Sequence, residues 1–309
     1  MAESCPLCCS SNTHAVESLP FGVLRRFYLR QMNIDLGEQS FVAIDLRRCE
    51  PCDLRFYTPA FSGDEKFYEP LQRFDWYYLA EKQEYEFAAH YVSSEDRVLE
   101  VGPGRGVFAE KIKSRSYTGL ELSEAAANQA RERGMSVYKC SIEEHSKDNA
   151  EGYDVVCSFQ VLEHIADTRS FIESCLRCLK SGGTMIHSVP YEDGFIGRQH
   201  NNILNMPPHH ATRWTDQALH NLARMFDLQV IAFGYDRLSD LHLRAYSVAL
   251  IENSMNRALG RRQRSLDAAF ENLLVKAPVR LLSRLLERGL KDKGLRPAGH
   301  SVTIVYRKP

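Results

Sequence analysis

Short apolar segments alternate with amphipathic segments through most of the chain beyond residue 96. The run Arg97-Val-Leu-Glu-Val predicts a short buried strand, and Phe108–Lys113 has the spacing of an opening helix. Further strands are expected at Ser116–Leu122, Met135–Cys140, Asp154–Phe159, Gly183–Val189, Leu228–Phe233 and Ser301–Tyr306, with helical patterns between most of them. Strands and helices that alternate at this pace predict an α/β fold with a parallel, doubly wound, Rossmann-like sheet.

Two regions outside this alternation have patterns of their own. The stretch from Phe67 to Tyr91 is aromatic and charged and predicts a helix, and Leu24–Gln31 predicts another one before it. A long helical segment precedes the last strand. We therefore expect a small N-terminal module (1–62), a core (63–253), a helical insertion (254–297) and the last strand of the core (298–309).

Composition narrows the class of protein. Of 309 residues, 44% are hydrophobic and 26% charged, which is ordinary for a globular protein and excludes collagen, long disorder and a disulfide-rich miniature. Lys plus Arg (39) nearly equals Asp plus Glu (40), so the charge gives no reason to expect nucleic acid as a partner. The sequence shows neither an apolar segment long enough to span a membrane nor the apolar core of a signal peptide, which predicts a cytoplasmic location. In that reducing compartment, the nine cysteines are not expected to form structural disulfides.

Four of the cysteines form two identical motifs, Cys5-Pro-Leu-Cys8 and Cys49-Glu-Pro-Cys52. Each CxxC turn places two sulfurs on one side of a bend, and two such turns can close a tetrahedral Zn²⁺ site. Four thiolates with no open position predict a structural zinc in a ribbon-like module; the alternative is that they are small core residues. Cys9 is expected to lie outside the site. Cys175 and Cys178 also form a CxxC motif, but they fall on an apolar helical stretch, so we expect them to pack as small hydrophobes.

A glycine-rich turn follows the first core strand. Gly102, Gly104 and Gly106 allow a ligand to approach the backbone closely, at the strand end where such sheets bind ligands. A dinucleotide fingerprint requires glycine at position 107, where the chain has Val107, so the pattern disfavours NAD. Glu121 ends the second strand and can accept both hydroxyls of a ribose, which suits a nicotinamide cofactor or S-adenosylmethionine.

The fourth strand carries the more specific motif. Tyr153-Asp-Val-Val-Cys-Ser-Phe-Gln-Val-Leu-Glu-His-Ile resembles the strand and Leu-Glu-His turn of class I S-adenosylmethionine-dependent methyltransferases. Val98-Leu-Glu-Val-Gly-Pro-Gly-Arg-Gly resembles the first motif of the same family, and the resemblance covers about residues 91–233. It implies cofactor contacts from Glu100, Gly102 and Gly104 (amino-acid end), Glu121 (ribose), Ser141 and Ile142 (adenine) and Gln160 (methionine portion). Family members often have Asp where this chain has Ser141.

The cysteine motifs extend the resemblance. A cysteine-rich segment, an aromatic helix and this core together are similar to zinc-containing sugar C-methyltransferases, which act on nucleotide-linked deoxysugars. Those enzymes usually carry a further large C-terminal domain, which we do not expect in a chain of this length. The resemblance therefore implies a shared zinc module, and it favours O-methylation of a sugar or glycan hydroxyl over C-methylation of a keto sugar.

A hydroxyl acceptor must lose a proton during methyl transfer, and histidine is the usual base. His164 lies in the turn expected to face the methyl group, although in the family it often has a structural or cofactor-side role. His209 and His210 follow two prolines in a loop expected to lie over the substrate cleft; alternatively, they cap backbone groups or remain solvated. We expect one of the three to act as the base, with a slight preference for His210. The further pocket candidates are Tyr191, Glu192, Asp193 and Trp214.

The insertion carries 11 Lys or Arg against four acidic residues, a net charge of +7. Within it, Arg280, Arg284, Arg288 and Lys291 follow helical spacing, and Val279, Leu282, Leu286 and Leu290 form a second stripe. A basic amphipathic helix over 278–291 is therefore expected. Such a helix packs on its own domain with its charges solvated; the alternatives are peripheral contact with an anionic membrane, at its inner face, or with an acidic acceptor.

These observations favour a polysaccharide- or carbohydrate-modifying methyltransferase that uses S-adenosylmethionine and structural Zn²⁺. C-methylation of a keto sugar, or methylation of another small metabolite, is the alternative within the enzyme class. A non-catalytic, cofactor-binding scaffold that recruits partners is the alternative outside it. The sequence predicts no particular oligomeric state.

Overall fold

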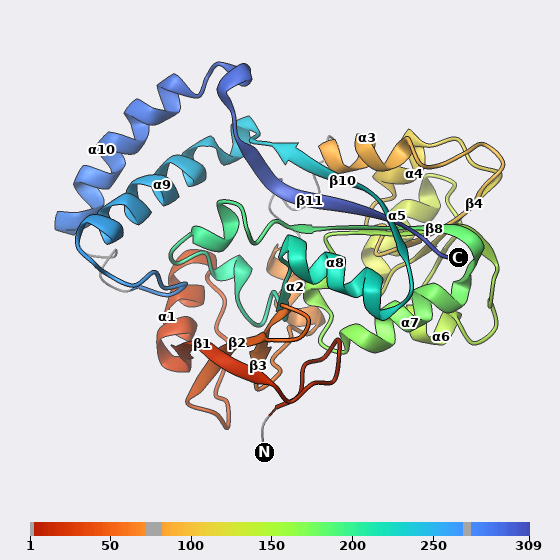
Figure 1. Ribbon diagram of the computed structural model, residues 1–309, viewed down its shortest axis with the longest axis horizontal. Coiled ribbons are helices and arrows are strands. Elements are labelled where there is room, and N and C mark those ends of the chain that lie inside the picture. Colours follow the sequence, from red (N-terminus) through yellow and green to blue (C-terminus); the bar gives the residue numbers. More distant parts are fainter. Residues whose placement is uncertain (1–2, 72–81, 268–272) are drawn as a thin grey trace.

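The larger of two β-sheets forms the centre of the computed structural model, which describes residues 3–71, 82–267 and 273–309 (Figure 1). Its strand order is β10-β11-β8-β7-β4-β5-β6. The strands are β4 (Arg97–Val101), β5 (Ser116–Leu120), β6 (Val137–Tyr138), β7 (Tyr153–Phe159), β8 (Leu179–Pro190), β10 (Gln229–Arg237) and β11 (Ala298–Arg307). β4 to β8 pair in parallel, whereas β11 is antiparallel to both neighbours. The expectation of a wholly parallel sheet was wrong at β11, because the chain leaves β10 and enters β11 at the same end.

Helices cover both faces of this sheet, as a doubly wound fold requires (Figure 1). One face carries α3 (Gln83–Ala89), α4 (Val107–Lys111) and α5 (Glu124–Glu132), and the other α6 (Ile142–His145), α7 (Thr168–Cys178) and α8 (Asp216–Met225). Because side chains alternate along a strand, Val98 packs with the core under α3 and α4, and Leu99 packs with the core under α7 and α8. The predicted Rossmann-like fold is confirmed.

The smaller sheet is antiparallel and has the order β1-β2-β3-β9. Its elements are β1 (Thr13–Pro20), α1 (Phe21–Met32), β2 (Ala43–Cys49), β3 (Arg55–Thr58) and, from much later in the chain, β9 (Thr212–Arg213). α2 (Glu65–Leu71) follows this sheet in the sequence. Leu24, Tyr28, Ile44 and Met206 share one buried core here. The N-terminal sheet is thus completed by the loop that follows β8.

Two helices, α9 (Leu243–Ala258) and α10 (Leu273–Gly289), lie side by side beyond one end of the large sheet (Figure 1). They connect β10 to β11, and α9 starts before residue 254, where the insertion was expected to begin. No helix in the described ranges has the length and apolarity to cross a bilayer. The single-turn helices are η1 (Leu162–His164), η2 (Ile196–Arg198), η3 (Ile203–Asn205), η4 (Asp240–His242) and η6 (Lys293–Leu295).

Several expected bounds differ from the structure. The helix expected over residues 67–91 is described only as α2 and α3, and its middle, 72–81, lies outside the described residues. The strand expected at 135–140 has only two residues, so Cys140 falls beyond it. On α10, Leu282 was expected in the packed stripe but is 46% exposed, whereas Ser283 is fully buried. Polar Ser283 lies on the packed face because its hydroxyl donates to the Arg280 carbonyl, so the hydrophobic pattern could not show this helix rotation.

Candidate functional site

The glycine-rich loop lies between β4 and α4, at the carboxyl end of the parallel strands. The N–H of Gly102 donates to the Leu120 carbonyl over 2.8 Å, and its φ of +73° favours glycine. A Cβ at Gly102 would come within 2.5 Å of Cγ2 of Val161. Glu121 Oε2 accepts a hydrogen bond from the N–H of Gly104 at 3.0 Å. The loop therefore lies against the end of β7, where folds of this type bind ligands.

The two carboxylates predicted to border the cofactor have different surroundings. Glu100 is 1% exposed and accepts a hydrogen bond from the Tyr117 hydroxyl at 2.6 Å. Burial raises the pKa of Glu100 to about 7. Burial also raises the pKa of Glu121, which stays partly exposed and accepts from the N–H of Ser123 at 2.9 Å. Of the two carboxylates, Glu121 retains surface for a ligand.

Gln160 directly follows β7 in a left-handed conformation, with φ of 56°. Its amide donates to Glu84 Oε2 at 2.8 Å and to the Ser301 hydroxyl at 3.1 Å. Glu84 also accepts from the Ser188 hydroxyl and lies 3.3 Å from the Lys82 ammonium. This buried network holds the turn after β7. Sequence reasoning missed Glu84, because a glutamate inside a charged helix carries no sign of burial.

The residues predicted to flank an adenine lie at the start of α6. Ser141 caps this helix, with its hydroxyl accepting from the N–H of Glu144 at 3.2 Å. Ile142 is 2% exposed and belongs to the core of the large sheet. The Ser141 hydroxyl, which was predicted to contact an adenine, is thus engaged within the helix.

Three histidines from two separate segments come together beyond β7. The ring centroids of His164 and His209 are 4.7 Å apart, those of His164 and His210 4.9 Å, and those of His209 and His210 4.7 Å. One nitrogen of each ring lies within 4.8 Å of the others. His164 ends η1, whereas His209 and His210 follow η3 in the loop between β8 and β9. The structure therefore brings all three base candidates into one cluster.

Glu163 adds a carboxyl to this histidine cluster. It is 2% exposed, and its Oε1 lies 3.7 Å from His164 Nε2 and 4.0 Å from His210 Nε2. Burial raises the pKa of Glu163 to about 8 and lowers that of His164 to about 4. Burial and the neighbouring rings lower the pKa values of His209 and His210 as well. The rings are therefore uncharged at neutral pH. Sequence reasoning missed Glu163, although it stands in the turn that pointed to His164.

The four predicted zinc ligands also meet. Cys5 Sγ lies 3.5 Å from Cys52 Sγ, Cys8 Sγ lies 3.3 Å from Cys49 Sγ, and all four sulfurs lie within 4.8 Å of one another. Tetrahedral Zn²⁺ with bonds of about 2.3 Å separates its sulfurs by about 3.8 Å, so the spacing fits. The exposed Cys9 lies outside the group, as expected.

The comparison with known families decides the class of protein. Residues 72–232, more than half of the chain, match the family described as "Methyltransferase domain". The chain belongs to this methyltransferase family. The class I, S-adenosylmethionine-dependent methyltransferase domain predicted from the glycine loop and the Leu-Glu-His turn is thereby confirmed.

Curated relatives of the methyltransferase resemble only part of it. The ubiquinone biosynthesis O-methyltransferase of Nitrosomonas europaea is 38% identical over 104 residues, 31% of this chain and 44% of that enzyme. The enzyme of the same name from Escherichia coli O9:H4 is 32% identical over 126 residues, 36% and 52% of the two chains. The chain thus spans about half the length of these relatives. A solved methyltransferase from Archaeoglobus fulgidus is 16% identical, with a TM-score of 0.46 over 72% of this chain and 90% of that one.

The other residues predicted to line the substrate pocket are either buried or bound to neighbouring side chains and backbone groups. Glu192 is 5% exposed, and its Oε1 lies 2.7 Å from Arg55 and 3.4 Å from Arg213. Trp214 is fully buried. The Tyr191 hydroxyl donates to Asp216 Oδ2 at 3.3 Å. Asp193 Oδ2 accepts from the backbone N–H of Asp216 at 2.9 Å. Glu192 and Trp214 also line one small enclosed pocket together with Glu163 and His210, so these two predicted pocket residues lie beside the histidine cluster.

The N-terminal module holds the histidine-bearing loop of the methyltransferase in place. The Tyr28 hydroxyl donates to the carbonyls of Ile203 at 2.7 Å and Met206 at 3.1 Å. The Tyr57 hydroxyl donates to the Asn205 carbonyl at 3.0 Å, and β3 pairs with β9 just after the histidines. Residues from the first sixty positions therefore set the geometry of His209 and His210.

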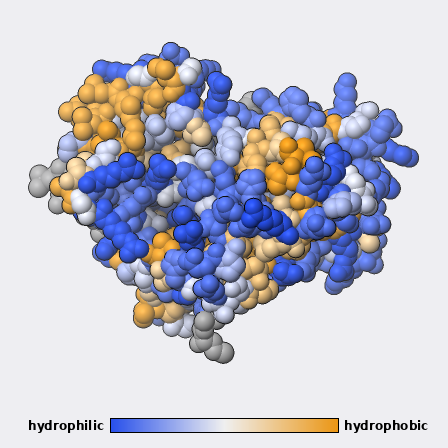
Figure 2. Space-filling view, viewed as in Figure 1, coloured by the Kyte–Doolittle hydropathy of each residue, from blue (hydrophilic) through white to orange (hydrophobic). Residues whose placement is uncertain are grey.

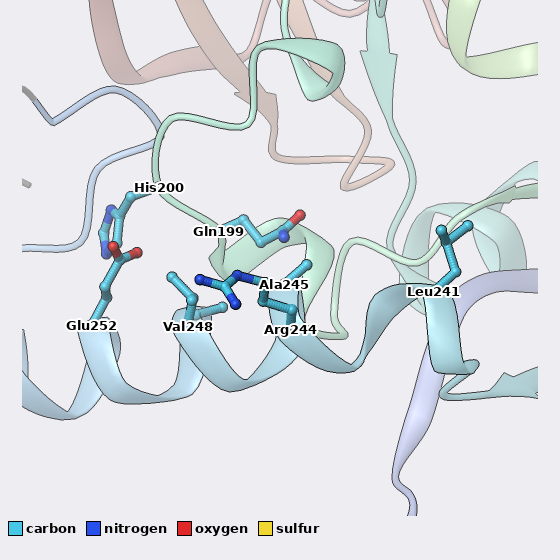
Figure 3. A pocket seen from close by; sticks show the side chains of 8 residues that line it. Gln199, His200, Leu241, Arg244, Ala245, Val248 and Glu252 are labelled. Carbon is cyan, nitrogen blue, oxygen red and sulfur yellow. The ribbon is translucent and has the colours of Figure 1, made fainter. Parts of the chain in front are cut away.

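A groove of about 370 Å³ runs along α9, between that helix and the loop after β8 (Figure 3). Its lining includes Gln199 and His200 from the loop, and Arg244 and Glu252 from α9. Figure 3 shows the Arg244 guanidinium between the helix and Gln199. The groove is within the size range of small-molecule pockets. It shares with the histidine cluster the loop that follows β8.

Proposed function

We propose that this methyltransferase moves the methyl group of S-adenosylmethionine to a hydroxyl oxygen of a small-molecule acceptor. The observation that carries the proposal is the cluster of His164, His209 and His210, with rings uncharged at neutral pH. Val161, three residues before His164, is the side chain that Gly102 approaches. The glycine loop and the histidine cluster therefore flank one turn, so a methyl group held at the loop would face the cluster.

In this arrangement the acceptor oxygen attacks the methyl carbon in line with the departing sulfur, and an imidazole nitrogen accepts the hydroxyl proton. The sequence favours His210 as this base. The side chain of His164 is the more accessible of the two, 20% exposed against 8%. We propose that both face the acceptor, with His209 fixing their positions by ring contacts.

For the cofactor, we propose that Glu121 binds the ribose hydroxyls and that Gly102 and Gly104 approach the amino-acid end. Two features support this: a side chain at Gly102 would collide with Val161, and Glu121 accepts hydrogen bonds from the N–H groups of Gly104 in the loop and of Ser123. Glu100, which is buried and accepts a hydrogen bond from Tyr117, would fix the end of β4 just before the loop. Gln160 would shape the turn rather than touch the methionine portion, because its amide is bound to Glu84.

The names of the relatives, ubiquinone biosynthesis O-methyltransferases, support oxygen as the accepting atom. A sugar or glycan hydroxyl stays a prediction that rests on the resemblance of the cysteine motifs. C-methylation of a keto sugar is the competing proposal. We also propose that the four-cysteine cluster holds a structural Zn²⁺, on the basis of its sulfur spacing.

The experiment combines cofactor binding with an acceptor panel. Calorimetry should show S-adenosylmethionine binding, and incubation with sugars, nucleotide sugars and phenols should yield one product heavier by a methylene group. His210→Gln should lower kcat at least about 100-fold, while His145→Gln, a half-buried histidine on α6, should retain activity. Methylation at carbon of a keto sugar, with no hydroxyl acceptor used, would overturn the proposal.

A second proposal concerns α10, which we infer to contact an anionic membrane surface. Leu281, Leu282 and Leu285 are 63%, 46% and 56% exposed, and Figure 2 shows an apolar patch over this helix. Arg280 and Arg284, also exposed, flank these leucines. An apolar strip bordered by cations suits the interface of an anionic bilayer.

Vesicle sedimentation tests this contact. The protein should sediment with phosphatidylcholine vesicles that contain phosphatidylglycerol, and salt should release it because charge attraction is screened. Leu281→Glu with Leu285→Glu should abolish sedimentation, and Val42→Glu, at an 89% exposed site of the N-terminal module, should not. Equal sedimentation of both variants would contradict the proposal.

A further inference from the structure

The three clustered histidines have the same hydrogen-bond pattern. Nδ1 of His164 lies 2.5 Å from the His209 carbonyl, Nδ1 of His209 lies 2.8 Å from the Leu204 carbonyl, and Nδ1 of His210 lies 3.1 Å from Asn205 Oδ1. Each oxygen is an acceptor, so each uncharged ring carries its proton on Nδ1 and a lone pair on Nε2. Histidines that bind metals almost always donate their other N–H to an oxygen in this way.

The spacing of the donor atoms also suits an ion. Ligand nitrogens of the three rings lie within 4.8 Å of one another. A tetrahedral Zn²⁺ with bonds of about 2.1 Å separates its ligands by about 3.4 Å, so the largest gap would close by at most about 1.4 Å. Rotation of the imidazoles about their side-chain bonds can supply such a movement.

A buried carboxylate completes the set. Glu163 Oε1 lies 3.7 Å from His164 Nε2 and 4.0 Å from His210 Nε2. Within the described residues, Glu163 Oε2 is buried without a hydrogen-bond partner. A buried polar atom normally has a partner, and a bound water or hydroxyl on a nearby ion would provide one.

We propose that His164, His209 and His210 bind a divalent transition-metal ion, with Glu163 accepting a hydrogen bond from the oxygen in the open position. Three protein ligands and one exchangeable position are typical of catalytic sites, in contrast to the closed four-cysteine cluster. Imidazole ligands suit Zn²⁺, Fe²⁺, Ni²⁺ or Cu²⁺ better than Mg²⁺ or Ca²⁺. The proposed role rests on the proposed function, because the exchangeable ligand would be the acceptor hydroxyl.

Binding to the ion would make the acceptor hydroxyl more acidic. The charge of the bound ion would favour the ionised form of Glu163, so the hydroxyl proton would pass to that carboxylate and then to solvent. The oxygen forms a bond to the methyl carbon, the carbon–sulfur bond breaks, and its electron pair stays on sulfur as S-adenosylhomocysteine is released. The metal would then replace an imidazole as the group that activates the hydroxyl.

The metal content of the full chain tests the site without any activity assay. After removal of metals and loading with Co²⁺, the wild type should bind about two ions: one with the intense sulfur-to-cobalt charge transfer of thiolate ligands, one with only the weaker bands of nitrogen and oxygen ligands. His210→Gln and His164→Gln should each lose the second ion and keep the first. His145→Gln should keep both.

The hydrogen bond behind His210 offers a subtler variant. Asn205→Ala removes the acceptor of His210 Nδ1 but no ligand, and it should weaken Co²⁺ binding at the second site about 10- to 100-fold. The thiolate band and S-adenosylmethionine binding in the same samples report that the module and the core are folded. A wild type that holds only the thiolate-bound ion, or folded histidine variants that keep both ions, would overturn the metal site. Neither result bears on hydroxyl methylation, which the acceptor panel tests separately.

Discussion

Replacing Glu192 with alanine should destabilise the protein far more than removal of an exposed ion pair. Glu192 Oε1 forms ion pairs with the guanidinium groups of Arg55, at 2.7 Å, and of Arg213, at 3.4 Å. The side chains of Glu192 and Arg213 are only 2% and 4% exposed. Glu192→Ala therefore leaves the Arg213 cation buried without its carboxylate, whereas Arg55, 28% exposed, regains water.

The size of the effect follows from what Arg213 retains. Breaking one side of a buried ion pair costs about 3–5 kcal/mol of unfolding free energy. Arg213 still donates to the Asn205 carbonyl at 3.0 and 3.2 Å and to the Ser265 hydroxyl at 3.2 Å. These remaining hydrogen bonds place the expected loss near the lower limit, about 3 kcal/mol.

Urea unfolding at pH 7, followed by fluorescence, measures this difference, and the fully buried Trp214 beside Arg213 is a natural reporter. The matched control is Glu173→Ala, which breaks an exposed pair with Arg169 on α7 and should change stability by no more than about 0.5 kcal/mol. If the two variants differed by less than about 1 kcal/mol, burial would not be the source of the stabilisation. If Glu192→Ala lost activity at unchanged stability, Glu192 would contact substrate, as the sequence predicts.

Three further outcomes are expected. Gly102→Ala should weaken S-adenosylmethionine binding at least about tenfold in calorimetry, because its Cβ would collide with a neighbour, while Gly134→Ala, with a similar φ but open space, should only lose stability. Cys49→Ser should lose about one zinc per chain by elemental analysis and Cys9→Ser none; equal contents would contradict the four-cysteine site. Burial raises the pKa of Glu100 to about 7 from about 4.3 in an unfolded chain, so its ionisation favours unfolding as pH rises through that interval. Glu100→Gln should therefore be more stable than wild type at pH 8, by up to about 4 kcal/mol, with the gain gone near pH 4; a pH-independent difference would refute this.

Local pattern was sufficient for the elements and motifs whose signal lies within a few residues. The strand at 97–101 and the glycines after it were predictable because alternation and close backbone approach leave a direct trace in residue type. Both cysteines of the helix at 168–178 are fully buried, as the apolar spacing predicted. The two CxxC motifs of the four-cysteine cluster were recognisable for the same reason, since each turn is complete in four residues.

Features that depend on distant segments were not predictable. His164 and His210 could each be singled out by chemistry, but their meeting depends on the course of the loop after β8. Trp214 lines an enclosed pocket with His210, but its complete burial in the core of the large sheet, where a large aromatic side chain gains most, could not be read from its neighbours in the sequence. Glu163 needed the fold to reveal its burial.

The pairing of β3 with β9 means that the cofactor loop and the histidine loop are positioned by different parts of the chain. The cofactor loop follows strands that lie between residues 97 and 159. The histidine loop is held by hydrogen bonds from Tyr28 and Tyr57 and by the short strand at 212–213. Substitutions of Tyr28 or Tyr57 would therefore act first on the loop of His209 and His210, which we propose to face the acceptor. A chimera that exchanges acceptor preference between related chains would have to transplant the N-terminal module and residues 191–215 together.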